Sequence, residues 1–230
     1  MRGSCATLAD AMPETTFSIS LSEGRSVTAI RIQPQGKPAW LVAYAPGAGS
    51  NVHDPFGKYL TRRLEQEGIS TVRLQFPYME ARKRRPDPPA FLEATWRAAI
   101  EALRGEAPRL VVGGRSMGGR IASQVVAAGA EVDALALFAY PLHPPGKSEQ
   151  TRDGHFPGIT VPTLFCSGTR DAFAAPEELR AATSNISSAT LHFLDGADHG
   201  FAVPKASGRT KDDVYADAAQ ALIDWLGHIS

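Results

Sequence analysis

The chain has 230 residues, of which 43% are hydrophobic and 21% are charged, a composition typical of a soluble globular domain with one substantial core. Its 24 basic residues balance its 24 acidic residues, so no global positive field favours nucleic acid or an anionic membrane as a partner. No segment approaches the roughly 18 uninterrupted apolar residues of a membrane-spanning helix, and residues 1–11 lack the apolar core of a secretion signal.

The two cysteines lie in very different settings, Cys5 in a polar segment and Cys166 inside an apolar run. Two widely spaced thiols make neither a disulfide framework nor a zinc site. We interpret Cys166 as a small buried apolar residue. Together with the missing secretion signal, this pattern favours a cytoplasmic protein.

The start of the chain predicts a short tail and then a hairpin. Residues 1–15 are expected to be a flexible N-terminal segment, and residues 16–230 a single domain, because no internal repeat or long linker divides them. Residues 16–21 and 27–33 alternate apolar and polar side chains around a turn signal at residues 22–24. This alternation predicts an antiparallel hairpin.

The rest of the chain alternates short apolar runs with amphipathic stretches. Continuous apolar runs are typical of strands that are covered on both faces, and apolar spacing of three and four residues is typical of helices packed on a sheet. Their alternation predicts an α/β fold with a mainly parallel central sheet and helices on both faces. The predicted strands are residues 40–45, 71–76, 109–113, 134–139, 162–167 and 190–194, and the predicted helices are residues 56–67, 89–103, 117–128, 176–185 and 213–228.

The longest irregular segment, residues 140–158, contains several prolines. It occupies the place where a lid domain is sometimes inserted into such a fold. A segment of this length shapes the rim of a site but is too short for a separate cap. We therefore expect no large lid.

A glycine-rich turn follows the predicted strand at residues 109–113. Gly114, Ser116 and Gly118 give the pattern G-x-S-x-G between this strand and the next predicted helix. In that context the serine lies on a strained turn, where the glycines let strand and helix approach and the helix amides favour negative charge. Ser116 is the predicted nucleophile. The alternative is a glycine-rich turn with a helix-capping serine.

A serine hydroxyl is a weak nucleophile, so it needs a base within hydrogen-bond reach and a group that orients the base. Asp171 follows one predicted strand, and His199 follows the next. In proteins whose nucleophile lies on a G-x-S-x-G turn, the nucleophile, the acid and the histidine follow one another in this order along the chain. Asp195 and Asp198 are rivals for the acid role, but their closeness to His199 in sequence favours a role in shaping its loop.

Attack by a serine on a carbonyl creates an oxyanion, which two backbone amides usually stabilise. The amide of Met117, directly after the nucleophile, is one candidate. The other lies in the glycine-rich turn at residues 44–50, where Ala48 is the first choice and Gly47 is expected to contact substrate. The alternative is that this turn is only a tight connection.

Further polar residues lie near these positions in the sequence. Arg115, beside the nucleophile, is expected to face substrate or to pair with a carboxylate of the fold. His53 either lines the pocket or packs at the entry of the next helix. The basic run at residues 82–85 either forms a cationic rim that selects anionic acyl substrates or is simply solvated. The other histidines show no metal-ligand spacing, so no metal site is predicted.

With these residues assembled, the chain resembles the α/β-hydrolase superfamily over nearly its whole length. It is similar to the compact members related to dienelactone hydrolase, which lack a large lid. Residues 76–80, 82–88 and 113–120 also resemble a small group of predicted bacterial α/β-hydrolases. Eukaryotic relatives of that group include a subunit of a chromatin-modifying complex. The resemblance implies the fold, and it implies no specific substrate.

Two departures from the superfamily pattern stand out. Many esterases carry His-Gly in the oxyanion loop, whereas Pro46 and Gly47 stand here, so the loop must be anchored differently. Dienelactone hydrolase itself uses a cysteine nucleophile, whereas this chain has Ser116, which separates it from that enzyme's particular substrate.

The residues together predict a serine hydrolase that transfers an acyl group to water. A small or medium carboxylic ester or thioester is the expected substrate, and a peptide would use the same side chains. No cofactor is expected, and the expected partner is a small-molecule acyl substrate. The alternative is a non-catalytic α/β-hydrolase scaffold that acts as a binding or regulatory partner. Retention of Ser116, Asp171 and His199 together argues against a pure scaffold.

Overall fold

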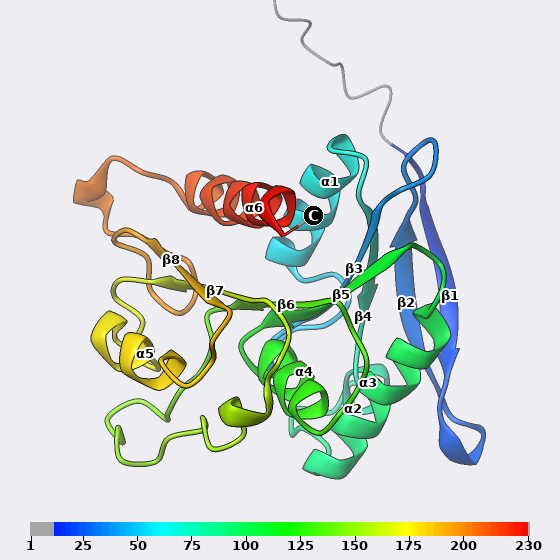
Figure 1. The fold of residues 1–230 in the computed structure, drawn as a ribbon, viewed down its shortest axis with the longest axis horizontal. Coiled ribbons are helices and arrows are strands. Elements are labelled where there is room, and N and C mark those ends of the chain that lie inside the picture. The colour runs from blue at the N-terminus through cyan, green and yellow to red at the C-terminus, as the bar shows by residue number, and fades with distance from the viewer. Residues whose placement is uncertain (1–11, 230) are drawn as a thin grey trace, which may run out of the picture.

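The computed structural model describes residues 12–229, so the expected flexibility of residues 1–11 lies outside the described part. One eight-stranded sheet runs through these residues, with helices on both faces (Figure 1). The first strand begins at Glu14, inside the segment predicted to be flexible. The strands are β1 (Glu14–Ser20), β2 (Ser26–Ile32), β3 (Trp40–Ala45), β4 (Ser70–Leu74), β5 (Arg109–Arg115), β6 (Ala134–Phe138), β7 (Thr163–Gly168) and β8 (Ala189–Leu194).

Every predicted helix occurs, with ends that differ by no more than two residues from those expected. One short helix, α2, was not predicted, because a single turn that begins at a proline shows no apolar period. No helix within residues 12–229 is both long and apolar enough to cross a membrane. The helices are α1 (Pro55–Gln66), α2 (Pro77–Glu80), α3 (Pro89–Leu103), α4 (Met117–Ala127), α5 (Pro176–Thr183) and α6 (Lys211–His228), with 3-10 turns at Ser22–Gly24, Phe156–Gly158 and Lys205–Ser207.

The strand order β1-β2-β4-β3-β5-β6-β7-β8 confirms a mainly parallel sheet with an antiparallel N-terminal hairpin. Strand β2 pairs antiparallel with both β1 and β4, and all pairs from β4 to β8 are parallel. In the pair β3–β5, Ala45 lies opposite Gly114. This register brings the loop after β3 beside the turn that follows β5.

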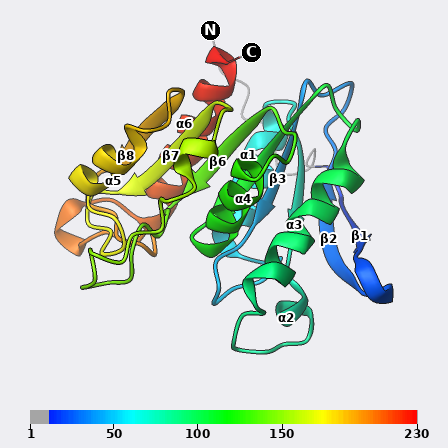
Figure 2. The same cartoon turned by 60° about the horizontal axis from the view of Figure 1, so that its bottom comes forward.

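The sheet separates two apolar cores, because alternate side chains of each strand point to opposite faces. In β3, Leu41 and Ala43 belong to the core under α3, α4 and α5, whereas Val42 and Tyr44 belong to the core under α1 and α6. Figure 1 shows α1 and α6 on one side of the sheet, and Figure 2 shows α3 and α4 side by side on the other. Cys166 lies in the second core, where burial raises the pKa of its thiol.

The carboxyl ends of β3, β5, β7 and β8 lie along one edge of the sheet, since these strands all run in the same direction. Their following loops carry the residues singled out by the sequence. In an open α/β sheet, ligands bind at this edge. Residues 141–155, between β6 and the turn at Phe156–Gly158, contain no helix and form a rim, as expected for a fold without a large lid.

Candidate active site

Ser116 lies alone between the end of β5 and the start of α4. Its backbone has φ 51° and ψ −118°, a conformation that a residue with a side chain adopts only under constraint. The constraint includes a hydrogen bond from the Ser116 amide to the carbonyl of Phe138 at 2.8 Å, across the neighbouring strand β6. The serine hydroxyl is therefore presented at the N-terminus of α4.

The glycines on either side of Ser116 are required by close approach of backbone. A Cβ at Gly114 would lie 2.0 Å from the carbonyl oxygen of Ala45, and one at Gly118 would lie 2.2 Å from the same atom. Gly114 also has φ 144°, which other residues rarely adopt. The pattern G-x-S-x-G thus lets the end of β3 pass against the turn.

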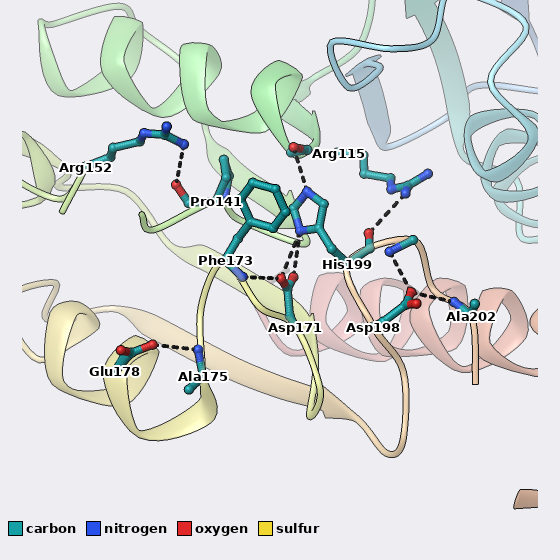
Figure 3. A network of polar contacts seen from close by, with 12 residues as sticks. Arg115, Pro141, Arg152, Asp171, Phe173, Ala175, Glu178, Asp198, His199 and Ala202 are labelled. Atoms are coloured by element: carbon teal, nitrogen blue, oxygen red, sulfur yellow. Dashed lines mark hydrogen bonds and ion pairs between the residues drawn. The ribbon is translucent and has the colours of Figure 1, made fainter. Parts of the chain in front are cut away.

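Three side chains from separate loops meet in a hydrogen-bonded relay. The Nε2 atom of His199 lies 2.9 Å from the Oγ atom of Ser116. On the other side of the imidazole, Nδ1 lies 2.8 Å and 3.0 Å from the two carboxylate oxygens of Asp171 (Figure 3). An ionised carboxylate can accept hydrogen bonds but cannot donate one. The network therefore assigns the ring proton of His199 to Nδ1, and it leaves Nε2 as the acceptor of a hydrogen bond from the Ser116 hydroxyl.

Of the two rival acids, Asp198 takes the loop-shaping role that the sequence favoured. Asp198 accepts hydrogen bonds from the amides of Gly200 at 2.7 Å and Ala202 at 2.9 Å, so it fixes the turn after β8. Asp195 is exposed. Asp171, by contrast, is only 4% exposed and faces the imidazole.

Phe173 is a site residue that the sequence did not reveal. Its ring stacks on the imidazole of His199, with centroids 4.0 Å apart and an interplanar angle of 28° (Figure 3). Its amide donates a hydrogen bond to Asp171 Oδ1 at 2.8 Å. Phe173 therefore holds both the base and the acid. The only sequence signal is its place two residues after the predicted acid.

The turn after β3 runs directly beside the nucleophile. A Cβ at Gly47 would lie 3.5 Å from the Cβ of Ser116, and the Ala48 carbonyl accepts a hydrogen bond from the Tyr78 hydroxyl at 2.8 Å. Burial, together with the nearby Asp87, raises the pKa of Tyr78 to about 12, which keeps this hydroxyl a donor. The Met117 amide starts α4 beside Ser116. The role of the Met117 and Ala48 amides in binding an oxyanion stays a prediction.

The far end of the same turn is anchored by Asp54, a buried side chain at the N-terminus of α1. Asp54 accepts hydrogen bonds from the Tyr44 hydroxyl at 2.6 Å, the Gly57 amide at 2.8 Å and the Ser50 hydroxyl at 3.2 Å. Burial and the Asp54 charge raise the pKa of Tyr44 well above its usual value. The sequence signal of this anchor is an Asp-Pro helix start at Asp54 and Pro55.

Arg115 pairs with the fold at the same time as it lines the site. Its Nη2 donates to the backbone carbonyl of His199 at 3.0 Å, and its Nη1 lies 3.8 Å from Asp54 Oδ1. Its guanidinium lies over the ring of Phe201, 5.2 Å from the centroid. Of the two roles expected for Arg115, pairing with a carboxylate is confirmed. Contact with substrate stays a prediction.

The structure corrects the expectation for His53. Its side chain is exposed, and the residue is not among those that line the cavity at Ser116. The reason lies in the turn before α1, where the His53 amide bonds to Asn51 Oδ1 at 2.8 Å and the neighbouring Asp54 side chain points inward instead. His53 neither lines the pocket nor packs at the helix entry.

A cavity of about 630 Å³ opens above the relay. Ser116, His199, Gly47, Ala48 and Arg115 all line it, so the predicted nucleophile, base and turn face one space. A volume of this size suits a small or medium organic molecule.

A second hollow, of about 380 Å³, adjoins the cavity, since Ala48, Gly49 and Ser50 line both. Three residues of the basic run, Arg82, Lys83 and Arg84, contribute to its wall, and all of them are exposed.

Residues 38–227 match the sequence model of the alpha/beta hydrolase domain. The chain belongs to the α/β-hydrolase family. Solved structures of this α/β hydrolase's fold include a dienelactone hydrolase from Anabaena variabilis, with 20% identity over 94% of this chain and 97% of that chain and a TM-score of 0.74. The esterase domain of a Rhodothermus marinus protein has 17% identity, coverage of 93% and 98%, and a TM-score of 0.71.

A third similar structure is an α/β serine hydrolase without a lid from Xanthomonas campestris. It shares 19% identity with this α/β hydrolase over 92% of this chain and 94% of its own, with a TM-score of 0.68. At these identities the likeness establishes the fold alone, and it agrees with the predicted α/β-hydrolase architecture. Family membership supports a hydrolase.

Proposed function

We propose that this α/β hydrolase is a serine hydrolase that cleaves a small or medium carboxylic ester or thioester by acyl transfer to water. The observation that carries the proposal is the continuous relay from Ser116 Oγ through both ring nitrogens of His199 to the Asp171 carboxylate, with contacts of 2.9 Å and 2.8 Å. A non-catalytic scaffold would gain nothing from this alignment.

In the proposed reaction, His199 Nε2 takes the Ser116 proton as Oγ attacks the carbonyl carbon of the substrate. The Met117 and Ala48 amides donate hydrogen bonds to the resulting oxyanion. The tetrahedral intermediate collapses, and His199 returns its proton to the leaving alcohol or thiol. Water, activated by His199 in turn, then hydrolyses the acyl-enzyme. Asp171 holds the imidazole in the required tautomer throughout.

The cavity supports the proposed substrate size. Its volume of about 630 Å³ fits a compact acyl group with its alcohol or thiol, and no helix of residues 141–155 closes over a long chain. We also propose that the protein acts in the cytoplasm on a small molecule, without nucleic acid or a membrane as its partner.

Hydrolysis of para-nitrophenyl esters of increasing acyl length tests this function. Native protein is expected to turn over short esters best. Ser116→Ala is expected to lower kcat by at least about a thousandfold, and Asp171→Asn by about ten-thousandfold, since an amide favours the wrong tautomer. Ser184→Ala removes an exposed hydroxyl at the end of α5 and serves as the matched control with native rates. Native rates in Ser116→Ala would refute the proposal.

A further inference from the structure

The cavity above Ser116 carries more positive than negative charge. Arg115, Arg120 and Arg152 line it, whereas Asp54 is the one acidic residue among its described lining residues. Asp54 is only 3% exposed, and its oxygens are occupied by Tyr44, Gly57 and Ser50. The local charge balance is therefore cationic, although the whole chain has a formal net charge of zero.

Arg115 has a carboxylate partner within the fold, whereas the other two arginines form no ion pair among the described residues. Arg120 Nη1 contacts Gln124 Oε1 at 3.3 Å, and Arg152 Nη1 contacts the Pro141 carbonyl at 3.3 Å. Both partners are neutral. Within residues 12–229, no carboxylate lies within the 4.0 Å ion-pair distance of either guanidinium.

Partial burial reduces the hydration of the Arg120 charge. Arg120 is partly buried, and burial, followed by the nearby Arg152 charge, lowers the pKa of its guanidinium, while Tyr140 and Glu93 act in the opposite direction with smaller effect than burial. Two guanidinium groups that face one cavity repel each other unless an anion lies between them. An anion in the cavity would remove that repulsion.

The two arginines line the cavity from different segments of the chain. Arg120 lies one helical turn beyond Ser116 on α4, where its amide donates to the Ser116 carbonyl at 3.0 Å. Arg152 comes from the rim segment, which its amide closes by a bond to the Leu142 carbonyl at 2.7 Å. Because both side chains line the cavity that Ser116 also lines, a substrate bound at Ser116 shares this space with both guanidinium groups.

We propose that Arg120 and Arg152 form an anion-binding subsite, so that the natural substrate is an ester or thioester that carries a carboxylate or phosphate group. The planar fork of a guanidinium suits both anions, because it donates two parallel hydrogen bonds to them. This inference rests on the proposed function, since it names the substrate class of the same site.

The basic run does not carry this inference. Arg82, Lys83 and Arg84 line the adjoining hollow, but they are exposed and solvated, and exposed charges contribute little to binding at physiological salt. Their side chains add positive potential at the approach to the cavity. Arg120 and Arg152 share the cavity with the nucleophile itself.

The test compares matched charged and neutral esters. The carboxylate pair is para-nitrophenyl hemiglutarate against para-nitrophenyl pentanoate, and the phosphate pair is acetyl glycerol phosphate against acetyl glycerol, followed by acetate release. Native protein is expected to favour the charged member of one pair by at least about tenfold in kcat/KM, as a charge-assisted hydrogen bond provides. Preference within the first pair identifies a carboxylate, and preference within the second identifies a phosphate.

Substitution locates the preference. Arg120→Gln and Arg152→Gln are each expected to reduce the charged-to-neutral ratio about tenfold, and Arg120→Lys is expected to retain part of it. Arg97→Gln removes the same charge from the exposed face of α3 and is expected to keep the native ratio. Thermal unfolding of each variant checks that it is folded. A native ratio near one in both pairs, or a ratio that survives both substitutions, would overturn the subsite.

A binding measurement separates this inference from the proposed function. Glutarate and inorganic phosphate are titrated by calorimetry into native protein, Arg120→Gln and Arg152→Gln. Binding that the variants lose supports the subsite even if no ester is hydrolysed, in which case only the proposed function falls. Hydrolysis of the neutral esters without any anion binding or charge preference leaves the function standing and removes the subsite. If the protein neither binds the anions nor hydrolyses any ester, both the subsite and the proposed function are refuted.

Discussion

Arg115 donates a hydrogen bond from Nη2 to the backbone carbonyl of His199 at 3.0 Å, which ties the residue before the nucleophile to the predicted base. The two residues are far apart in sequence and reach each other across the edge of the sheet. The same guanidinium also faces Asp54 at the start of α1. Arg115 therefore connects the nucleophile turn, the histidine loop and the anchor of the turn after β3.

From this connection we expect Arg115 to act as a positioning residue. Arg115→Met is expected to lower kcat about tenfold with KM within about twofold of native, because loss of one charge-assisted hydrogen bond loosens the His199 loop. Arg115→Lys is expected to recover part of kcat. Steady-state kinetics on a short neutral ester measure both values. A raised KM with native kcat would show instead that Arg115 mainly binds substrate.

Gly118 should be intolerant of any side chain. An added Cβ would lie 2.2 Å from the Ala45 carbonyl oxygen and 2.6 Å from that of Pro46, and neither backbone atom can move alone. Gly118→Ala is expected to lower the free energy of unfolding by about 1–3 kcal/mol, as overpacking does, and also to reduce kcat by displacing the turn after β3.

The matched control for that substitution is Gly227→Ala, near the end of α6, where no atom lies within 4 Å of the added Cβ. A gain of about 0.5–1 kcal/mol is expected there, since alanine favours helix. Urea unfolding measures both variants. Equal stability of Gly118→Ala and native protein would mean that the close approach to β3 is not maintained in solution.

His155 should make the fold sensitive to mild acid. Its Nε2 lies 2.8 Å from the Ser123 hydroxyl, and burial, with the nearby Arg120 charge, lowers its pKa to about 4. Above the ordinary histidine pKa of about 6.5, both folded and unfolded chains hold it neutral. As the pH falls from there toward 4, only the unfolded chain binds the proton, so folding is progressively weakened.

The measurement is the change in unfolding free energy between pH 7 and pH 5. His155→Gln is expected to reduce that change by about 1 kcal/mol, allowing for the partial exposure of the ring. Carboxylates contribute equally to both proteins and cancel in the comparison. An identical pH dependence in native protein and variant would contradict a depressed histidine pKa.

The fold and the relay follow from patterns that are local in sequence. Apolar runs and helical periods predict the strands and helices to within two residues at their ends, because each pattern reflects burial on a sheet. Ser116 follows β5 directly, Asp171 and His199 lie in the loops after β7 and β8, and parallel strands bring these ends to one edge. The order of the strands along the chain is therefore enough to predict that these three side chains meet.

The contacts that surround the three residues cannot be predicted from chain order. The stack of Phe173 on His199 and the placement of Arg152 in the cavity depend on the paths of two loops, which no periodicity reports. Arg120 was not predicted as a residue of the cavity for another reason, since a basic residue on a helix is usually solvated. His53 was misplaced because the turn before α1 directs Asp54 inward and His53 outward.

Labelling with a fluorophosphonate tests the central claim, that His199 activates the Ser116 hydroxyl. The probe reacts with a serine only when a neighbouring base accepts its proton, so native protein is expected to be labelled at Ser116, as mass spectrometry of its peptides will report. Ser116→Ala is expected to remove the label, and His199→Gln to reduce it at least about a hundredfold. Labelling that is equal in native protein and Ser116→Ala, or absent from both, would contradict the account.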